Sequence, residues 1–167
     1  MRVEEYGGKG REMTEIAGER QPRRVHGRIL ALDVGAKRIG IAVSDELGWT
    51  AIGLDTLHRG RVREDVAHIA RIAAGHAAET ILLGLPLNLD GSEGSQAEYV
   101  RDFGERLKKR AGLRVEYWDE RLSSVAAEQV LAGQPVRSKR SKGDVDRVAA
   151  AIVLQEYLDT RSAGERE

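Results

Sequence analysis

Two short apolar runs joined by a glycine-containing turn limit the folds open to this chain more than any other feature. Residues 29–32 (ILAL) lead into Asp33, Val34 and Gly35, and residues 39–43 (IGIAV) follow shortly after. Runs of this length and composition around a short turn indicate an antiparallel hairpin. Asp33 ends the first of these strands, where an acid serves either as a turn former or as part of a site.

The chain after this hairpin predicts one further strand and then an alternation of helices and strands. Three hairpin-connected strands followed by that alternation indicate an α/β fold with a mixed five-stranded sheet. The sheet has a three-stranded antiparallel meander, two parallel strands and helices on its faces. The further strands are expected at 51–57, 80–85 and 115–118, and the helices at 61–78, 95–109, 144–158 and from Ser123 or Ser124 to about residue 132.

The length of 167 residues fits one domain. Residues 1–27 are rich in Gly, Glu and Arg and have no apolar periodicity, so they bury too little surface to offset the entropy of ordering. We therefore expect a flexible N-terminal extension at 1–27, a domain at 28–160 and a flexible C-terminal tail at 161–167.

Composition excludes several classes of protein. With 27 basic and 27 acidic residues the chain is neutral, so attraction to nucleic acid depends on local patches. The absence of cysteine excludes disulfides and thiolate metal sites, and it suits a reducing compartment. No apolar run approaches the roughly 20 residues of a membrane span, and the N-terminus does not resemble a signal peptide. These features predict a cytoplasmic protein with no membrane partner.

Three acids are expected near the carboxyl ends of the strands, where open α/β sheets bind ligands. Asp33 ends the first strand, Glu120 ends the fifth, and Asp146 lies near the start of the last helix. Crowded carboxylates favour a hard divalent cation, Mg²⁺ or Mn²⁺, which would support phosphodiester hydrolysis. Each acid also has a purely structural explanation, and spacing alone does not separate Asp146 from Asp144, since both suit a helix N-terminus.

Basic and polar residues near these acids are candidates for contact with a phosphate backbone. The loop at 133–143 has four basic residues and no acid, which predicts salt-dependent binding. Aromatic residues make up only 4% of the chain, which argues against a base-stacking platform. The nucleic-acid-binding candidates are Lys37, Arg38, Asn88, Arg121, Arg140 and Lys142, with Ser92 beside Asn88.

Four segments follow the order of motifs in a known family. They are 32–45 (LDVGAKRIGIAVSD), 84–93 (GLPLNLDGSE), 119–124 (DERLSS) and 142–150 (KGDVDRVAA) continued by 154–158 (LQEYL). Together they resemble the YqgF/RuvX family of pre-16S rRNA nucleases. The match extends from about residue 28 to residue 159 and leaves residues 1–27 outside.

The resemblance implies a three-layer RNase H-like fold with helices on both faces of the sheet. It places the family's three carboxylates, as catalytic and metal-binding groups, on Asp33, Glu120 and Asp146. It also implies a nuclease that processes the 5′ end of pre-16S rRNA in ribosome biogenesis, with the RNA or the ribosomal particle as partner. The chain departs from the family at Asp144, where members often have a basic residue. The extra charge there either assists metal binding or weakens contact with phosphate.

Two other functions remain open from the sequence. A DNA endonuclease similar to Holliday-junction resolvases would act on branched DNA and would need a symmetric dimer, and the chain is expected to be a monomer or a homodimer. A non-catalytic RNA-binding factor in ribosome assembly is the alternative of a different class, although three intact acids argue against it. The Asp-X-Gly motif is also similar to that of sugar kinases and actin-like ATPases, which need two such domains.

Overall fold

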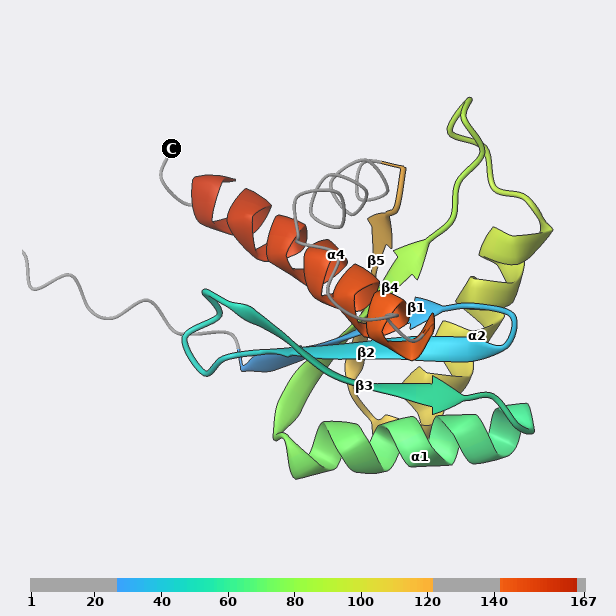
Figure 1. Cartoon of the computed structure of the whole chain (residues 1–167), viewed down its shortest axis with the longest axis horizontal. Helices are drawn as coiled ribbons and strands as arrows, with labels where there is room; N and C mark the ends of the chain where they lie inside the picture. The colour runs from blue at the N-terminus through green and yellow to red at the C-terminus, as the bar shows by residue number, and fades with distance from the viewer. Residues whose placement is uncertain (1–26, 122–141, 165–167) are drawn as a thin grey trace, which may run out of the picture.

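A mixed five-stranded sheet in the order β3-β2-β1-β4-β5 forms the centre of the molecule (Figure 1). The structure is a computed structural model and describes residues 27–121 and 142–164. Strands β1, β2 and β3 are antiparallel neighbours, whereas β4 is parallel to both β1 and β5. The predicted meander and parallel pair are thus confirmed. The strands are β1 (Arg28–Val34), β2 (Arg38–Ser44), β3 (Ala51–His58), β4 (Ala78–Leu85) and β5 (Arg114–Asp119).

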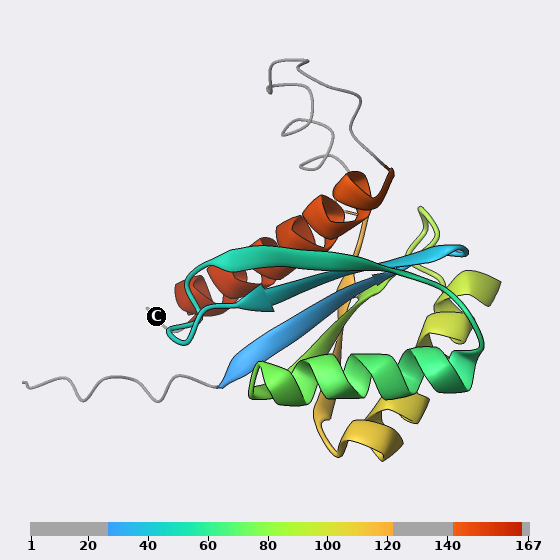
Figure 2. The same cartoon turned by 60° about the horizontal axis from the view of Figure 1, so that its bottom comes forward.

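Helices cover both faces of the sheet and complete three layers (Figures 1 and 2). Helices α1 (Val62–Gly75) and α2 (Ser95–Ala111) lie on one face, and α4 (Lys142–Gly164) lies on the other. The helix expected from residue 123 and most of the basic loop at 133–143 fall outside the described residues. None of the helices in the described ranges is long and apolar enough to cross a membrane.

Helix α4 is longer than the predicted 144–158 at both ends. Its large apolar residues stop at Leu158, but polar side chains continue to bond to the preceding turn. Ser162 Oγ donates to the Leu158 carbonyl oxygen at 3.0 Å, and Arg161 Nη1 donates to the Tyr157 hydroxyl at 3.2 Å. Apolar periodicity marks only the part of a helix that packs on the core, so it underestimates a helix with a polar end.

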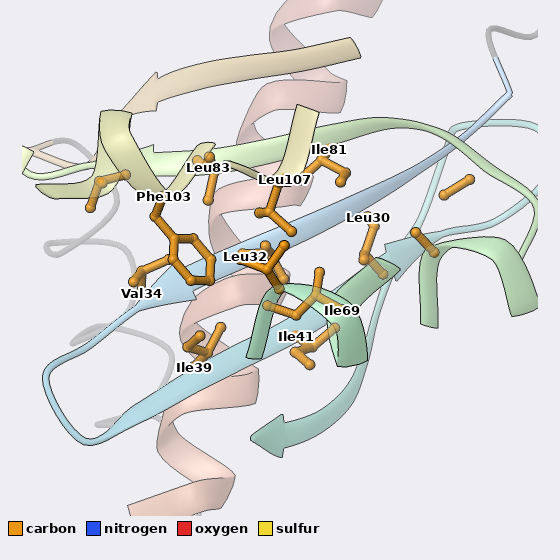
Figure 3. Packing of buried hydrophobic residues seen from close by; sticks show 14 of the residues in the cluster. Leu30, Leu32, Val34, Ile39, Ile41, Ile69, Ile81, Leu83, Phe103 and Leu107 are labelled. Atoms are coloured by element: carbon orange, nitrogen blue, oxygen red, sulfur yellow. The ribbon is translucent and has the colours of Figure 1, made fainter. Parts of the chain in front are cut away.

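The larger hydrophobic core lies between the sheet and helices α1 and α2 (Figure 3). Leu30, Leu32 and Val34 face it from β1, at every second residue, as the alternation of side chains along a strand requires. Phe103 and Leu107 of α2 pack against them and are almost fully buried. Most of the large aliphatic side chains of the sheet lie on this face, whereas Ile29 and Leu82 lie on the other.

A second, smaller core lies between the sheet and α4. The alternate residues of the hairpin face this side, and two of them are the small residues Ala31 and Ala42. Leu154 of α4 is fully buried against them, and the ring of Tyr157 meets that of Trp118 edge to face at a centroid distance of 5.6 Å. Small residues on the sheet let the helix axis approach closely.

Candidate functional site

Strand alternation directs Asp33 to the α4 face of the sheet. Ile29 and Ala31 pack under α4, so Asp33, the next residue of the same parity, points to that side. Leu32 and Val34, on either side of it, enter the opposite core. Asp33 therefore lies at the carboxyl end of β1, on the face with the smaller core, and is only partly exposed.

Glu120 reaches the same place from β5. Trp118 faces α4, and Glu120 lies two residues further along, just beyond the end of the strand. Its backbone N–H donates to the Leu85 carbonyl oxygen at 3.2 Å, which holds it beside the end of β4. The Glu120 carboxyl is hydrogen-bonded to that of Asp33. The structure thus joins two of the three predicted acids.

Burial and mutual repulsion make this carboxyl pair reluctant to ionise. Burial raises the pKa of Glu120 to about 7, and the adjacent Asp33 charge and hydrogen bond act in the same direction. The pKa of Asp33 is also raised, first by burial and then by the Asp146 charge, while the hydrogen bond from Glu120 opposes the rise. A hydrogen bond between two carboxyl groups requires a proton on one of them, so the pair is stable as a monoanion unless a cation neutralises it.

Asp146 lies close enough to influence Asp33 but has a different partner. Its Oδ2 accepts from Arg38 Nε at 2.5 Å, and both side chains are three-quarters buried. Arg38 is the first residue of β2 and lies two residues before Gly40, which pairs with Asp33. The Arg38 side chain therefore points to the same face of the sheet as that of Asp33. Throughout residues 27–121 and 142–164, no three acidic or histidine side chains converge as a metal site. Asp146 is therefore a neighbour of the Asp33–Glu120 pair, and the Arg38 guanidinium holds its carboxylate.

The basic candidates lie in different environments. Lys37 is exposed in the turn between β1 and β2. Arg121 is bound to Asp119, with Nη2 at 2.6 Å from Oδ2, although it directly follows Glu120. Arg140 and the side chain of Lys142 lie outside the part of the chain that the structure describes.

Asn88 belongs to a closed loop after β4. Its side-chain amide donates to Ser92 Oγ at 2.9 Å, and its backbone N–H donates to the Ser92 carbonyl oxygen at 2.9 Å. Ser92 Oγ in turn donates to Asp90 Oδ1 at 2.6 Å. These bonds close the turn that Gly91 permits with a φ of 86°. Asn88 therefore holds the loop in shape, and contact with nucleic acid would require its amide to exchange partners.

A cleft of about 510 Å³ lies at the hairpin turn, toward α2. Arg59 forms part of its wall and was not predicted from the sequence. Its Nη1 donates to the Gly35 carbonyl oxygen at 3.0 Å, and its guanidinium lies 5.0 Å from the centroid of the Tyr99 ring. It thereby supports the turn that follows Asp33. Nothing in the local sequence marks an arginine for this task. The cleft is lined by Ala36, Lys37, Arg59, Gly60, Gln96 and Tyr99, and by none of the three acids.

The chain matches one family along most of its length. Residues 27–160 match the model of the RuvX family, described as Holliday junction resolvase. A protein of Desulforamulus reducens named "Putative pre-16S rRNA nuclease" is 46% identical over 133 residues, covering 80% of this chain and 97% of the relative. A protein of Myxococcus xanthus with the same name is 47% identical over 132 residues, covering 79% and 87%. The chain therefore belongs to the RuvX family.

A solved structure supports the fold independently. Thermus thermophilus RuvC in complex with a Holliday junction substrate superposes with a TM-score of 0.56, covering 83% of this chain and 97% of that chain. The sequences are only 14% identical, so the likeness concerns the fold. It confirms the predicted RNase H-like architecture.

Proposed function

We propose that this chain is a metal-dependent nuclease that processes the 5′ end of pre-16S rRNA in the cytoplasm. Membership of the RuvX family makes it a hydrolase of phosphodiester bonds, and relatives at 46–47% identity are named for pre-16S rRNA. The observation that supports the proposal most is the buried, hydrogen-bonded pair of Asp33 and Glu120 at the carboxyl ends of β1 and β5. A structural ion pair would join opposite charges, whereas this pair joins two acids.

The donor set fits a hard divalent cation. Asp33 and Glu120 offer carboxylate oxygens, the ligands that Mg²⁺ and Mn²⁺ prefer. Burial and the closeness of other acids raise the pKa of both groups, and a bound cation would offset that repulsion. A cation bound there would lower the pKa of a water molecule and stabilise the leaving oxygen of a phosphodiester. We assign Asp33 and Glu120 as two ligands of the cation. Asp146 is the third ligand, and its carboxylate must first be released from its ion pair with Arg38.

The surrounding residues would bind and orient the substrate. Lys37, exposed in the hairpin turn, and Arg121, adjacent to Glu120, can contact phosphates near the acids. Arg38 keeps Asp146 directed toward the sheet and can offer its remaining donors to a phosphate oxygen. Below about pH 7 Glu120 retains its proton, so the fully ionised pair requires either higher pH or a bound cation.

A paired cleavage assay tests the proposal. Wild type and Asp33→Asn are incubated with a pre-16S rRNA 5′ substrate in Mg²⁺ or Mn²⁺. Loss of one ligand should reduce cleavage at least roughly 100-fold, or about 3 kcal/mol, while circular dichroism shows an intact fold. Asp144→Asn, which changes an acid paired with Arg147 on the same helix, is the matched control. Equal cleavage by wild type and Asp33→Asn would refute the assignment of a nuclease site to Asp33, and cleavage by neither would indicate a non-catalytic RNA-binding factor.

Branched DNA is a second candidate substrate, because the matched family model is described as a Holliday junction resolvase. Resolution of a four-way junction needs two sites related by symmetry, so this function predicts a dimer in solution. Running the same variants on a four-way junction, together with light scattering, separates the two substrates. Cleavage of the junction by a dimer, with none of the RNA, would replace the rRNA assignment.

A further inference from the structure

Asp33 is flanked by a glycine on each neighbouring strand. Gly40 of β2 pairs directly with Asp33. On the other side Leu32 pairs with Leu83, so Gly84 of β4 is the residue beside Asp33. Paired residues of neighbouring strands point to the same face. Asp33 is therefore the only member of this row of three with a side chain on the α4 face.

Gly84 lies on the path that Glu120 takes to Asp33. Strand β4 separates β1 from β5, so the Glu120 side chain must cross it. Neighbouring strands are about 4.8 Å apart, so β1 and β5 are separated by about 10 Å, and the Glu120 and Asp33 side chains can meet above β4 only if no side chain stands between them. A Cβ atom at Gly84 would lie 2.9 Å from both Cγ and Cδ of Glu120, and closer still to Oε1. Any side chain at this position would occupy the path.

Gly40, on β2, lets the backbone of Asp146 lie close to the sheet on the other side of Asp33. A Cβ atom there would lie 2.5 Å from the carbonyl carbon of Asp146 and 3.1 Å from the backbone nitrogen of Arg147. The backbone of α4 thus rests directly on β2 at the residue paired with Asp33. This contact brings Asp146 near enough for its charge to raise the pKa of Asp33.

Backbone conformation does not explain these two glycines. The glycines with positive φ within the described ranges are Gly48, Gly91 and Gly112. Gly40 and Gly84 have strand conformations that alanine adopts readily. Glycine within a strand otherwise weakens the strand, and it commonly marks a close approach by another group. What these positions require is the absence of a side chain.

We propose that Gly40 and Gly84 are positioning residues of the acidic site. Gly84 gives the Glu120 carboxylate its route to Asp33, and Gly40 lets α4 bring Asp146 beside the pair. The inference rests on the proposed function in one respect, namely that these acids serve as cation ligands. It extends that function by assigning a task to two residues that touch neither substrate nor cation.

The two positions differ in which atoms must move. At Gly84 the obstacle is the end of a flexible side chain, so Gly84→Ala should fold normally and displace only the Glu120 carboxylate. At Gly40 the obstacle is helix backbone, so Gly40→Ala should displace α4 and lower the melting temperature. Gly75 at the end of α1 has nothing within 4 Å of its Cβ position, so Gly75→Ala is the matched control.

The test uses the full chain and Mn²⁺ as the probe. Crystal structures of metal-free wild type, Gly84→Ala and Gly75→Ala locate the Glu120 carboxylate, and calorimetry measures Mn²⁺ affinity. We expect Gly84→Ala to melt within a few degrees of wild type, to separate Glu120 from Asp33, and to bind Mn²⁺ at least about tenfold more weakly. Gly75→Ala should match wild type in both measurements.

A Gly84→Ala structure in which Glu120 still meets Asp33 would overturn the inference. If the wild type binds Mn²⁺, the affinity of Gly84→Ala would then also be unchanged. The crystallographic comparison decides the question even if wild type binds no Mn²⁺. If the wild type binds Mn²⁺ but cleaves neither RNA nor the four-way junction, the proposed function is refuted. The crystal structures would still show whether Gly84 determines the position of Glu120.

Discussion

The two faces of the sheet differ in what they contribute. The face under α1 and α2 has large aliphatic residues in every row, closed by Phe103 and Leu107. The face under α4 has fewer large aliphatic residues, Ile29 and Leu82, together with alanines and glycines, and beyond them two acids that share a hydrogen bond. Burial of apolar surface stabilises the first face, whereas burial of carboxylates costs free energy at the second. Alternate residues of one strand belong to the two faces, so burial of apolar side chains on one face can offset the free-energy cost of burying carboxylates on the other.

The largest expected effect comes from the packed face. Phe103→Ala removes a ring that is 1% exposed and stacked on Tyr99. It should lower the free energy of unfolding by about 3–5 kcal/mol, measured by urea denaturation. The Mn²⁺ affinity of the protein that remains folded should not change, because the ring lies on the other side of the sheet from Asp33. A tenfold loss of affinity would show that the faces are not independent.

A smaller effect of opposite sign is expected at Glu120. Its pKa of about 7 exceeds the ordinary 4.5, so between these values the folded protein keeps a proton that the unfolded chain has lost. The free energy of unfolding of the metal-free protein should therefore fall as pH rises through this window. Glu120→Gln should remove that fall and be more stable than wild type at pH 8 by roughly 1–2 kcal/mol.

Denaturation in a chelator at pH 5 and pH 8 measures this difference. The stability of wild type and Glu120→Gln should be similar at the lower pH and should separate at the higher one. Cleavage by Glu120→Gln should be lost at both. If the free energies of unfolding of the two proteins differ by the same amount at both pH values, ionisation of Glu120 does not destabilise the folded state.

Arg38 offers a finer test of the functional face. Arg38→Gln removes the cation held 2.5 Å from Asp146 and leaves that carboxylate available to an ion. Mn²⁺ affinity should rise roughly three- to tenfold by calorimetry, because a competing positive charge is gone. Arg147→Gln, which removes the partner of Asp144, is the control and should leave affinity unchanged. A fall in affinity for Arg38→Gln would mean that Asp146 needs the guanidinium to face the site.

The smallest effect is expected at Asp144, the other acid near the start of α4. Asp144 forms an i,i+3 pair with Arg147 at 2.6 Å, and both side chains are about two-fifths exposed. Such pairs contribute little, so Asp144→Asn should change the free energy of unfolding by no more than about 0.5 kcal/mol. Its cleavage rate should stay within roughly twofold of wild type. A larger loss of cleavage would bring Asp144 into the acidic site.

Local patterns predicted the sheet well, because strand alternation and turn chemistry depend on neighbours in sequence. The hairpin around Asp33, the meander and the parallel pair all followed from such patterns. The pairing of Arg38 with Asp146 did not, since 108 residues separate them and each had another reasonable explanation. The meeting of Glu120 with Asp33 was predicted from their places at strand ends, but the route of the Glu120 side chain across β4 was not. The glycines at positions 40 and 84 were a visible clue, because strands usually avoid glycine.

The ion pair between Arg38 and Asp146 has a thermodynamic consequence. In the proposed nuclease, the Asp146 carboxylate would be shared between the guanidinium and a divalent cation, and the guanidinium would have a competing anion in the phosphate backbone. A phosphate that draws Arg38 away frees Asp146 for the cation, and a cation on Asp146 frees Arg38 for the phosphate. By linkage, each ligand must raise the affinity for the other by the same factor. The pair would thus make the binding of nucleic acid and of metal cooperative.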